Sequence, residues 1–590
     1  MSQRVVTILL ITILLVTTDQ HAQTIRRSDV VFMYDNPKMY RPYGATVLGW
    51  AGWPKQQHIR EAHANGVRQF SCSVGLLTES RRVIDFSEDF LDAACRDFDG
   101  KPFVTPWLWD QKHKYNGHPS YWWCTNSPLY QRYVFSRIEE VMKSEPDGLH
   151  IDDYRGTSGS VTWLAGGFCR HCMSAFRDYL ATNVSKDELK AAGVTDLNRF
   201  DYRQFLIDRG VTKDDYRKRR NKLPLADAFY DFQVKAANRF AIECRKRAEA
   251  VRGKPVSFSV NSGLSSPHAL VIARELSHFC CEVKHQAATL KPPTHPVYIY
   301  KLADGLNRHV ASTASGHDWA LVKEQSRPGL VRTWIAMSYA FGHTLMAPHR
   351  QWCYTKEKGT HWHESDPADY APLYRFVRRH ARLLDDYEAV AQVAVVYSAA
   401  DQRRYRGSIE KICATLAERN IPFTVVIAGD DWVDYRLNSK QLSAFKAVIV
   451  PKDVHLGDAQ QKLIDKVAKQ KRLVVWPDDN RLSELVGKPI AVEGSQHIWA
   501  VARLKRSDDA LPVVHLLNRQ YNSQNDSMTP QTNVVIRLRR DLFGGRQVAV
   551  ATLHTPQSSD RLNVSADEHY VTIKAPMRRH WGLIEFGETN

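Results

Sequence analysis

The chain has 590 residues, 43% of them hydrophobic and 25% charged, which excludes a disordered or fibrous protein and predicts two to four globular domains. The formal net charge is +17, but Lys and Arg are scattered in short runs such as 217–220, which disfavours a nucleic-acid partner. A positive field suits an anionic polysaccharide, uronic or sulfated, because it raises the local concentration of such chains. A generally basic exported protein is the alternative explanation.

The N-terminus has the pattern of a secretory signal peptide at residues 1–22. Arg4 precedes an apolar run from Val5 to Val16, and polar residues continue to Ala22. This run is too short to cross a bilayer, and no later segment is long and apolar enough. The sequence therefore predicts a secreted or periplasmic protein with no membrane partner.

Residues 23–388 alternate between apolar strand-like runs and helical stretches, which predicts a parallel sheet. Eight strands with crossovers match a (β/α)8 TIM barrel, with an insertion at about 157–225 after the fourth strand. An open doubly wound sheet is the alternative, but no Gly-rich phosphate loop follows a strand. The expected strands are Thr46–Trp50, Val67–Cys72, Pro102–Trp107, Gly148–Ile151, Pro255–Val260, His278–Glu282, His309–Thr313 and Thr344–Ala347.

Two further domains are expected after the barrel. Residues 389–488 alternate between strands and helices and predict a small flavodoxin-like α/β domain. Residues 489–590 contain short alternating strands, which predict an antiparallel β-sandwich. The fold class is therefore α/β, with a barrel, a flavodoxin-like domain and a sandwich.

Polar and aromatic residues gather where the barrel strands are expected to end. Carboxyl ends of barrel strands carry the chemistry of this fold. Indole rings stack on sugar faces, and carboxylates bind hydroxyls, so this mixture predicts a carbohydrate site. The candidate substrate-binding residues are Trp50, Trp109, Asp110, His150, Arg155, Asn261, Lys284, His285, Asp318, Trp319, His349 and Arg350.

Glycoside hydrolysis needs two carboxyl groups facing the scissile bond. Asp152, at the end of the fourth strand, is the candidate nucleophile or base, or the charge that stabilises the transition state. Glu282 follows an apolar run, a setting that raises a carboxyl pKa as a general acid requires. Asp153 is the third candidate, although it could instead orient Arg155. Acyl transfer is disfavoured, since no Ser, Cys or Thr has a convincing nucleophile context.

Two segments resemble barrel glycosidases. The segment Asp147–Tyr154, with sequence DGLHIDDY, is similar to the fourth-strand motif of bacterial barrel glycosidases, in several clans of which the terminal acid is the nucleophile. The segment Gly167–Arg177 resembles the C-x-x-C-x-x-A-F-R stretch of family-42 glycoside hydrolases, the β-galactosidases. The order of three domains is also that family's, in which the middle domain resembles a trimerisation domain. This resemblance implies a homo-oligomer formed through residues 389–488.

The chain departs from family 42 at the catalytic positions. That clan has an Asn-Glu pair after strand four and a Glu after strand seven, where this chain has Asp152-Asp153 and Asp318. Acids on strands four and six, such as Asp152 and Glu282, are instead the layout of α-galactosidase-like barrels. The anomeric configuration is therefore left open between α and β.

The family resemblance also implies a metal site near the insertion. Cys124, Cys169 and Cys172 match three of the four Cys positions that hold zinc in family 42, and Gly167 stands at the fourth. His171 or another residue would complete a structural zinc site, which needs four ligands. A disulfide among these cysteines is the alternative in an oxidising compartment.

These observations predict a secreted glycosidase acting on a poly- or oligosaccharide with no required cofactor, and the three cysteines would hold a structural zinc or form a disulfide. A non-catalytic carbohydrate-binding barrel is the alternative, and a transglycosidase would use the same residues. The sequence does not specify the sugar, the linkage, or endo or exo action.

Overall fold

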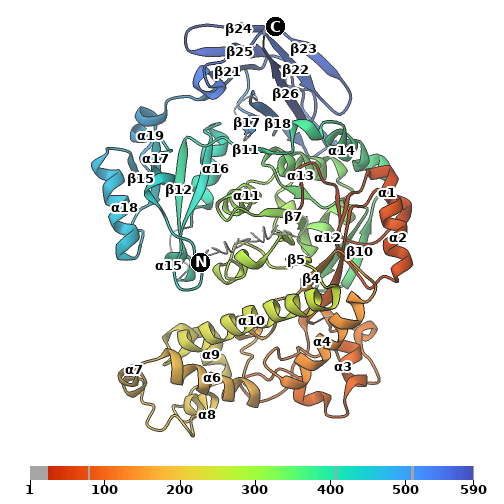
Figure 1. Ribbon diagram of the computed structural model, residues 1–590, viewed down its shortest axis with the longest axis vertical. Helices are drawn as coiled ribbons and strands as arrows, with labels where there is room; N and C mark the ends of the chain where they lie inside the picture. Colours follow the sequence, from red (N-terminus) through yellow and green to blue (C-terminus); the bar gives the residue numbers. More distant parts are fainter. Residues whose placement is uncertain (1–23, 78–79, 405–407, 506–510, 589–590) are drawn as a thin grey trace, which may run out of the picture.

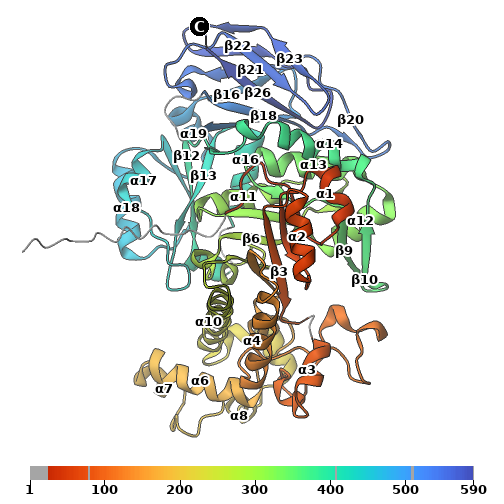
Figure 2. The same ribbon diagram turned by 45° about the vertical axis from the view of Figure 1, so that its right-hand side comes forward.

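The computed structural model describes residues 24–77, 80–404, 408–505 and 511–588. The predicted signal peptide, residues 1–22, lies outside the described residues. Three parts follow one another along the chain: a large α/β part, a smaller α/β part and a strand-rich C-terminal part. The C-terminal part lies at one end of the molecule, and the helices around residues 170–219 lie at the other (Figures 1 and 2).

Within the described residues, the first part has eight parallel strands in two sheets, β1–β5 and β6–β8. Backbone hydrogen bonds join these sheets at both edges, from Ser277 N to Phe258 O (2.9 Å) and from Ala347 N to Val31 O (2.8 Å). The strands are β1 (Val31–Phe32), β2 (Val47–Ala51), β3 (Gln69–Gly75), β4 (Gly148–Asp152), β5 (Ser257–Val260), β6 (His278–Val283), β7 (His309–Ala314) and β8 (Thr344–Leu345).

Helices connect these strands and cover the sheets (Figure 1). They are α1 (Pro37–Tyr43), α2 (Gln56–Ala64), α3 (Ser80–Phe86), α4 (Pro128–Met142), α5 (Gly156–Trp163), α6 (Arg170–Asn183), α7 (Lys186–Ala191), α8 (Tyr202–Ile207), α9 (Lys213–Arg219), α10 (Ala226–Arg252), α11 (His295–Gly305), α12 (Gly316–Gln325), α13 (Pro328–Ala340) and α14 (Pro367–Arg379). Helices α5–α9 lie where the insertion was expected. They share a buried apolar cluster with residues 95–124 and with α10, and this cluster is separate from the main core of the first part.

Two strand predictions need correction. The short strand β1 was not expected, whereas the expected strand Pro102–Trp107 is irregular, with isolated bridges and a 3-10 turn at Pro106–Leu108. Pro102 and Pro106 lack the N–H that a ladder needs, which explains the difference. The two errors cancel in the count, so the Gly148 strand is still the fourth. Trp109 and Asp110, however, do not lie at a strand tip.

The second α/β part has a four-stranded parallel sheet in the order β13-β12-β14-β15. Its strands are β12 (Val393–Ser398), β13 (Phe423–Ala428), β14 (Ala447–Pro451) and β15 (Leu473–Trp476). The accompanying helices are α15 (Ala399–Arg403), α16 (Glu410–Glu418), α17 (Ser439–Ser443), α18 (Asp458–Lys469) and α19 (Asp479–Val486).

The C-terminal part has two larger antiparallel sheets, in the orders β11-β17-β18-β26-β22-β23 and β16-β21-β25-β24, whose side chains meet in one apolar core. Its first edge strand is β11 (Tyr387–Ala389), so the predicted boundary at 388–389 falls inside a strand of this part. The other strands of these two sheets are β16 (Ile490–Glu493), β17 (Ile498–Lys505), β18 (Val513–Asn518), β21 (Val535–Arg539), β22 (Val550–His554), β23 (Ser559–Leu562), β24 (Val564–Ala566), β25 (Tyr570–Lys574) and β26 (Trp581–Gly587). A small hairpin of β19 (Tyr521–Asn522) and β20 (Ser527–Met528) lies between β18 and β21 in the sequence.

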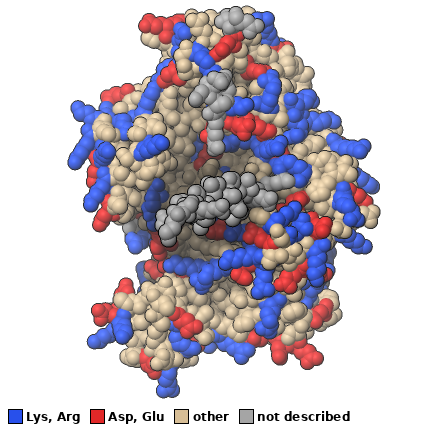
Figure 3. Space-filling view, in the orientation of Figure 1, with Lys and Arg blue, Asp and Glu red and all other residues tan. Residues whose placement is uncertain are grey.

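Lys and Arg are spread over the face seen in Figure 3 and alternate with Asp and Glu. This distribution follows from their scatter along the sequence. Among the helices of the described residues, none combines the length and the apolar character needed to span a membrane.

Candidate active site

Strand β4 is held tightly at its start and turns sharply after its end. A Cβ on Gly148 would lie 2.4 Å from Ser71 Oγ and 2.7 Å from Ser257 O, so only glycine fits between the neighbouring strands. After the strand, Gly156 has a φ of +46°, and a Cβ there would lie 2.3 Å from Thr125 Cγ2. The two glycines therefore fix where the acids of this segment are placed.

Asp152 and Glu282 belong to one hydrogen-bonded group at the carboxyl ends of β4, β5 and β6. Asn261, which follows β5, donates from Nδ2 to Asp152 Oδ1 at 3.0 Å. Its Oδ1 accepts from the backbone N–H of Glu282 at 3.4 Å. The amide of Asn261 thus links the two carboxyl residues that the sequence proposed as a catalytic pair.

The two carboxyl groups differ in acidity. Burial raises the pKa of Asp152 to about 6, and the hydrogen bonds from Asn261 and the Asp153 backbone oppose this shift. Burial, the charge of Asp152 and the charge of Asp318 raise the pKa of Glu282 to about 8. At neutral pH, Asp152 is therefore ionised and Glu282 is protonated, the division of labour that an acid-base pair needs.

Asp153 is a third carboxyl group in the same half-buried setting. Burial raises its pKa well above the usual value, and the charges of Asp152 and Glu282 add to this shift. Its φ of +55° lies in the left-handed region, where Asp is one of the more tolerant residues. Its carbonyl accepts from Gly156 N at 2.9 Å, so Asp153 forms the turn after β4 as well as lining its end.

Tyr34 faces this group and was missed by the sequence analysis. Burial raises its pKa well above the usual value, and the charges of Asp152 and Glu282 add to the shift, so its hydroxyl stays protonated beside them. Its ring lies 5.1 Å from that of Trp362. The Arg350 guanidinium lies 4.3 Å from the centre of the Trp362 ring. The sequence feature that could have identified Tyr34 as a site residue is its position directly after the apolar run that forms β1.

Several predicted substrate contacts are buried instead of lining a rim. Trp50 packs on His150 at 4.5 Å, His285 on Trp334 at 4.7 Å, and His349 on Phe32 at 4.3 Å. Burial holds the pKa of all three histidines below the usual value. These aromatic rings therefore pack against other buried rings within the fold.

Asp318 and Trp319 also have structural partners. The Asp318 carboxylate accepts from the backbone N–H groups of His285 (2.8 Å) and Ala287 (2.7 Å), which fixes the loop after β6. Trp319 is 1% exposed, and its Nε1 donates to Thr313 Oγ1 at 2.9 Å. Their sequence position near a strand tip did not reveal these partners, which come from other segments.

The remaining predicted residues lie at or near the surface. Lys284 is exposed, and Arg155 and Asn261 are half-buried. The Nε of Arg350 lies 3.8 Å from Oε1 of Glu364. Asp110 accepts from His113 Nδ1 at 2.7 Å. It also lies beside Gly359, which belongs to the hairpin formed by β9 (Arg350–Thr355) and β10 (Gly359–Glu364).

Among the described residues, one group brings three side chains able to bind a metal close together: Cys124, Cys169 and Cys172. Cys124 Sγ lies 3.3 Å from Cys169 Sγ and 3.4 Å from Cys172 Sγ, and all three thiols are free. Hydrogen bonds from the two other thiols hold the pKa of Cys169 well below the usual value. The expected fourth ligand, His171, instead has its Nε2 2.9 Å from Asp92.

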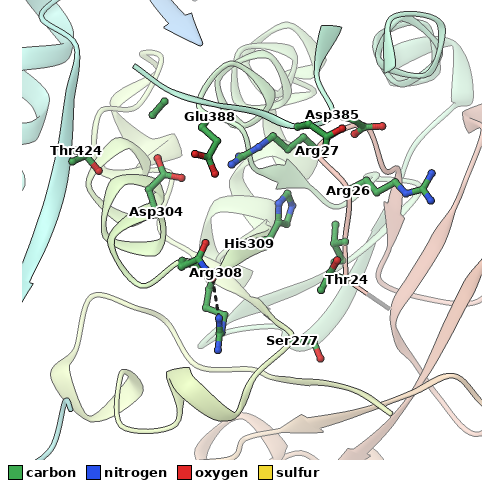
Figure 4. Close-up of a pocket in the computed structure, with 14 residues that line it drawn as sticks. Thr24, Arg26, Arg27, Ser277, Asp304, Arg308, His309, Asp385, Glu388 and Thr424 are labelled. Atoms are coloured by element: carbon green, nitrogen blue, oxygen red, sulfur yellow. Dashed lines mark hydrogen bonds between the residues drawn. The ribbon is translucent and has the colours of Figure 1, made fainter. Parts of the chain in front are cut away.

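A cavity of about 800 Å³ lies away from these carboxyl groups. Ser277 and His309, which line it, stand at the amino ends of β6 and β7, whereas Asp152 and Glu282 lie at carboxyl ends. Figure 4 shows charged residues of both signs around it, including Arg308, Asp304 and Glu388. Since ligand sites of parallel α/β sheets lie outside the carboxyl ends of the strands, this cavity is not the candidate active site.

No protein-family model matches the chain. An alpha-agarase from Thalassotalea agarivorans is 25% identical over 496 residues, which cover 80% of this chain and 33% of that protein. An alpha-agarase from Alteromonas agarilytica is 23% identical over 609 residues, covering 96% of this chain and 41% of that protein. The chain thus spans about a third to two fifths of the length of the curated relatives it matches.

Solved structures resemble the chain over its whole length. The alpha-L-fucosidase isoenzyme 2 from Paenibacillus thiaminolyticus has a TM-score of 0.63 and 12% identity, covering 96% of this chain and 100% of that one. A beta-galactosidase from Bacillus circulans sp. alkalophilus has a TM-score of 0.58 and 12% identity, covering 95% and 99%. The chain therefore has the mixed α/β fold, with a strand-rich C-terminal region, that these glycosidases share.

Proposed function

We propose that the chain is a glycosidase that cleaves a polysaccharide of the agar type. The observation that carries this proposal is the pair of half-buried residues Asp152 and Glu282, whose carboxyl groups have different raised pKa values. Asn261 joins the Asp152 carboxylate to the backbone N–H of Glu282. The similarity to two proteins named alpha-agarase supports the choice of polysaccharide. An anionic galactan, sulfated or uronic, also suits the net charge of +17.

The chemistry follows from the protonation states at neutral pH. Glu282 donates its proton to the glycosidic oxygen as the bond to the anomeric carbon breaks. The Asp152 carboxylate attacks that carbon or stabilises its oxocarbenium-like transition state. Water then supplies a hydroxyl to the anomeric carbon, which releases the Asp152 carboxylate where a glycosyl ester has formed, and its proton returns to Glu282. Asp153, Asn261, Arg155, Lys284 and Arg350 would bind hydroxyls or charge around the reacting sugar.

The alternative is a protein that binds carbohydrate without cleaving it. Ion pairs between these carboxylates and Lys or Arg would favour the non-catalytic alternative, because an ion pair lowers a carboxyl pKa and so removes the protonated general acid. The recorded side-chain partner of Asp152 is instead the neutral amide of Asn261, which favours hydrolysis.

The architecture and location form part of the same proposal. Strands β1–β8 would close into one (β/α)8 barrel, as the hydrogen bonds at both sheet edges support. The order β13-β12-β14-β15 supports a flavodoxin-like domain, and the shared core of the C-terminal sheets supports a sandwich. The N-terminal pattern of residues 1–22 supports export.

A substrate panel tests the activity. The purified protein should release reducing ends from agarose or its sulfated relatives, and not from starch or cellulose. Adding a short acceptor sugar would reveal transglycosylation as longer products. Absence of new reducing ends and of longer products on every galactan tested, by a chain that binds agarose, would establish the non-catalytic alternative.

We also propose a structural zinc ion held by Cys124, Cys169 and Cys172, with a fourth ligand not identified. Three converging thiols suit zinc, which favours tetrahedral sulfur coordination. Metal analysis should find about one zinc per chain, and Cys169→Ser should reduce this content and lower the melting temperature. Thiol titration provides the opposing outcome: absence of zinc with two fewer titratable thiols would indicate a disulfide.

A further inference from the structure

Two tryptophan rings of the first α/β part are unusually exposed. Trp109 is 51% exposed and Trp163 is 50% exposed. Leaving such rings in water sacrifices burial energy, and clustered exposed aromatics mark binding surfaces. Neither ring has been used by the mechanism above.

Trp163 belongs to an ordered cluster with Trp107 and Trp122. The ring planes of Trp163 and Trp107 are nearly parallel, at 10° with centroids 5.8 Å apart. Trp122 supports both edge-on, at 5.8 Å from Trp107 and 6.3 Å from Trp163. Trp122 is itself 3% exposed, and its Nε1 donates to Gly156 O at 3.2 Å. The ring of Trp163 is therefore held in place by Trp107 and Trp122.

The cluster is continuous with the carboxyl groups along two paths. Helix α5 begins at Gly156, just after Asp152 and Asp153, and its eight residues, about 12 Å long, end at Trp163. The β9–β10 hairpin forms the second path, since Trp362 lies against Tyr34 while Thr360 Oγ1 donates to Trp107 O at 3.1 Å. At the turn of this hairpin, Gly359 lies beside Trp109 and Asp110.

We propose that Trp107, Trp109 and Trp163 form a subsite that binds the polysaccharide chain several sugar units away from the bond that is cleaved. The apolar faces of sugar rings stack on indoles, and Asp110 with its partner His113 provides polar contacts at the edge. The inference rests on the proposed function for the identity of the chain.

Binding can be measured apart from cleavage, in the Asp152→Asn background. Native electrophoresis through gels containing dissolved agarose should retard this protein, and adding Trp163→Ala should weaken binding about tenfold. Trp163→Phe should retain most of the retardation, because a smaller aromatic ring still stacks. Val475→Ala, which alters a side chain that is 49% exposed on β15, is the matched control and should change nothing.

The outcomes separate this inference from the proposed function. Loss of retardation on Trp163→Ala would support the subsite even if the protein without substitutions yields no new reducing ends or longer products from any galactan tested, a result that would refute the glycosidase. Equal retardation of the Ala and Phe variants would overturn the subsite, as would an absence of retardation in the parent. A second copy of the chain is the other molecule that could cover this surface, and light scattering tests for it. A smaller particle mass on Trp163→Ala would make this surface a subunit interface and overturn the inference.

Discussion

Replacing Asp152 with Asn should lower kcat on the polysaccharide by about 10³-fold or more. Asn has nearly the same shape but can neither carry the negative charge nor form a glycosyl ester. The fold should persist, because burial raises the pKa of Asp152 and so opposes its charged form, and a neutral amide avoids that cost. Initial rates of reducing-end release, with circular dichroism of both proteins, measure the two effects.

Asp214→Asn is the matched control for this substitution. Its side chain is 74% exposed on α9, far along the chain from the carboxyl group, and its activity should equal that of the native protein. Asp152→Gly with added azide tests the nucleophile role, since a small anion can attack the anomeric carbon in place of the missing carboxylate. An Asp152→Asn protein that retains native turnover would refute the assignment.

Glu282→Gln should remove the alkaline limb of the pH profile and reduce kcat by about 10²–10⁴-fold on natural substrates. Native activity requires Asp152 ionised and Glu282 protonated, so kcat/KM should rise through about pH 6 and fall through about pH 8. Glutamine has no titrating proton, so the fall near pH 8 should disappear. Rates from pH 4 to 10 provide the measurement.

Leaving-group dependence separates a general acid from a residue that only shapes the site. Aryl glycosides with very acidic phenols need no proton, so Glu282→Gln should cleave them almost as fast as the native protein. A persistent alkaline limb in this variant would instead assign that limb to Asp153, whose pKa is also raised by burial. Asp153→Asn would then be the variant that lacks it.

The contribution of the Asp152 and Glu282 carboxyl groups to the free energy of unfolding should fall as the pH rises. The pKa of Glu282 is raised in the folded state, so its protonated form favours folding below the unfolded pKa of about 4.5, and this contribution declines as pH rises towards 8. Asp152 acts likewise up to about pH 6. The site therefore gains its acid at neutral pH by opposing ionisation within the folded protein.

Local patterns were sufficient for the elements that carry the acids. The short apolar run of β4 ends in two acids, and parallel strands place their carboxyl ends at one edge, so Asp152 and Glu282 could be brought together from sequence. The long helices α4 and α10 were also predictable, since their apolar residues recur with helical spacing.

Other features depend on partners that are distant in the sequence. Strand β1 has only two residues and is defined by pairing with β2, so Tyr34 was overlooked. Residues 102–107 have a strand-like composition, but their two prolines prevent a continuous ladder. Asp318 looks like a catalytic acid by position, and its role became visible only through the loop N–H groups that it accepts from.

Strand β11 has a consequence for how the chain acquires its structure. It pairs with β17, and the second α/β part lies between them in the sequence. During synthesis β11 must wait until that part has been made before its partner exists, and such distant pairing is slow. A truncation after residue 388 would leave most of β11 without its partner strand, whereas one starting at 489 would remove the edge strand of the final sheet. The C-terminal part is therefore expected to fold last and to resist separation as an independent fragment.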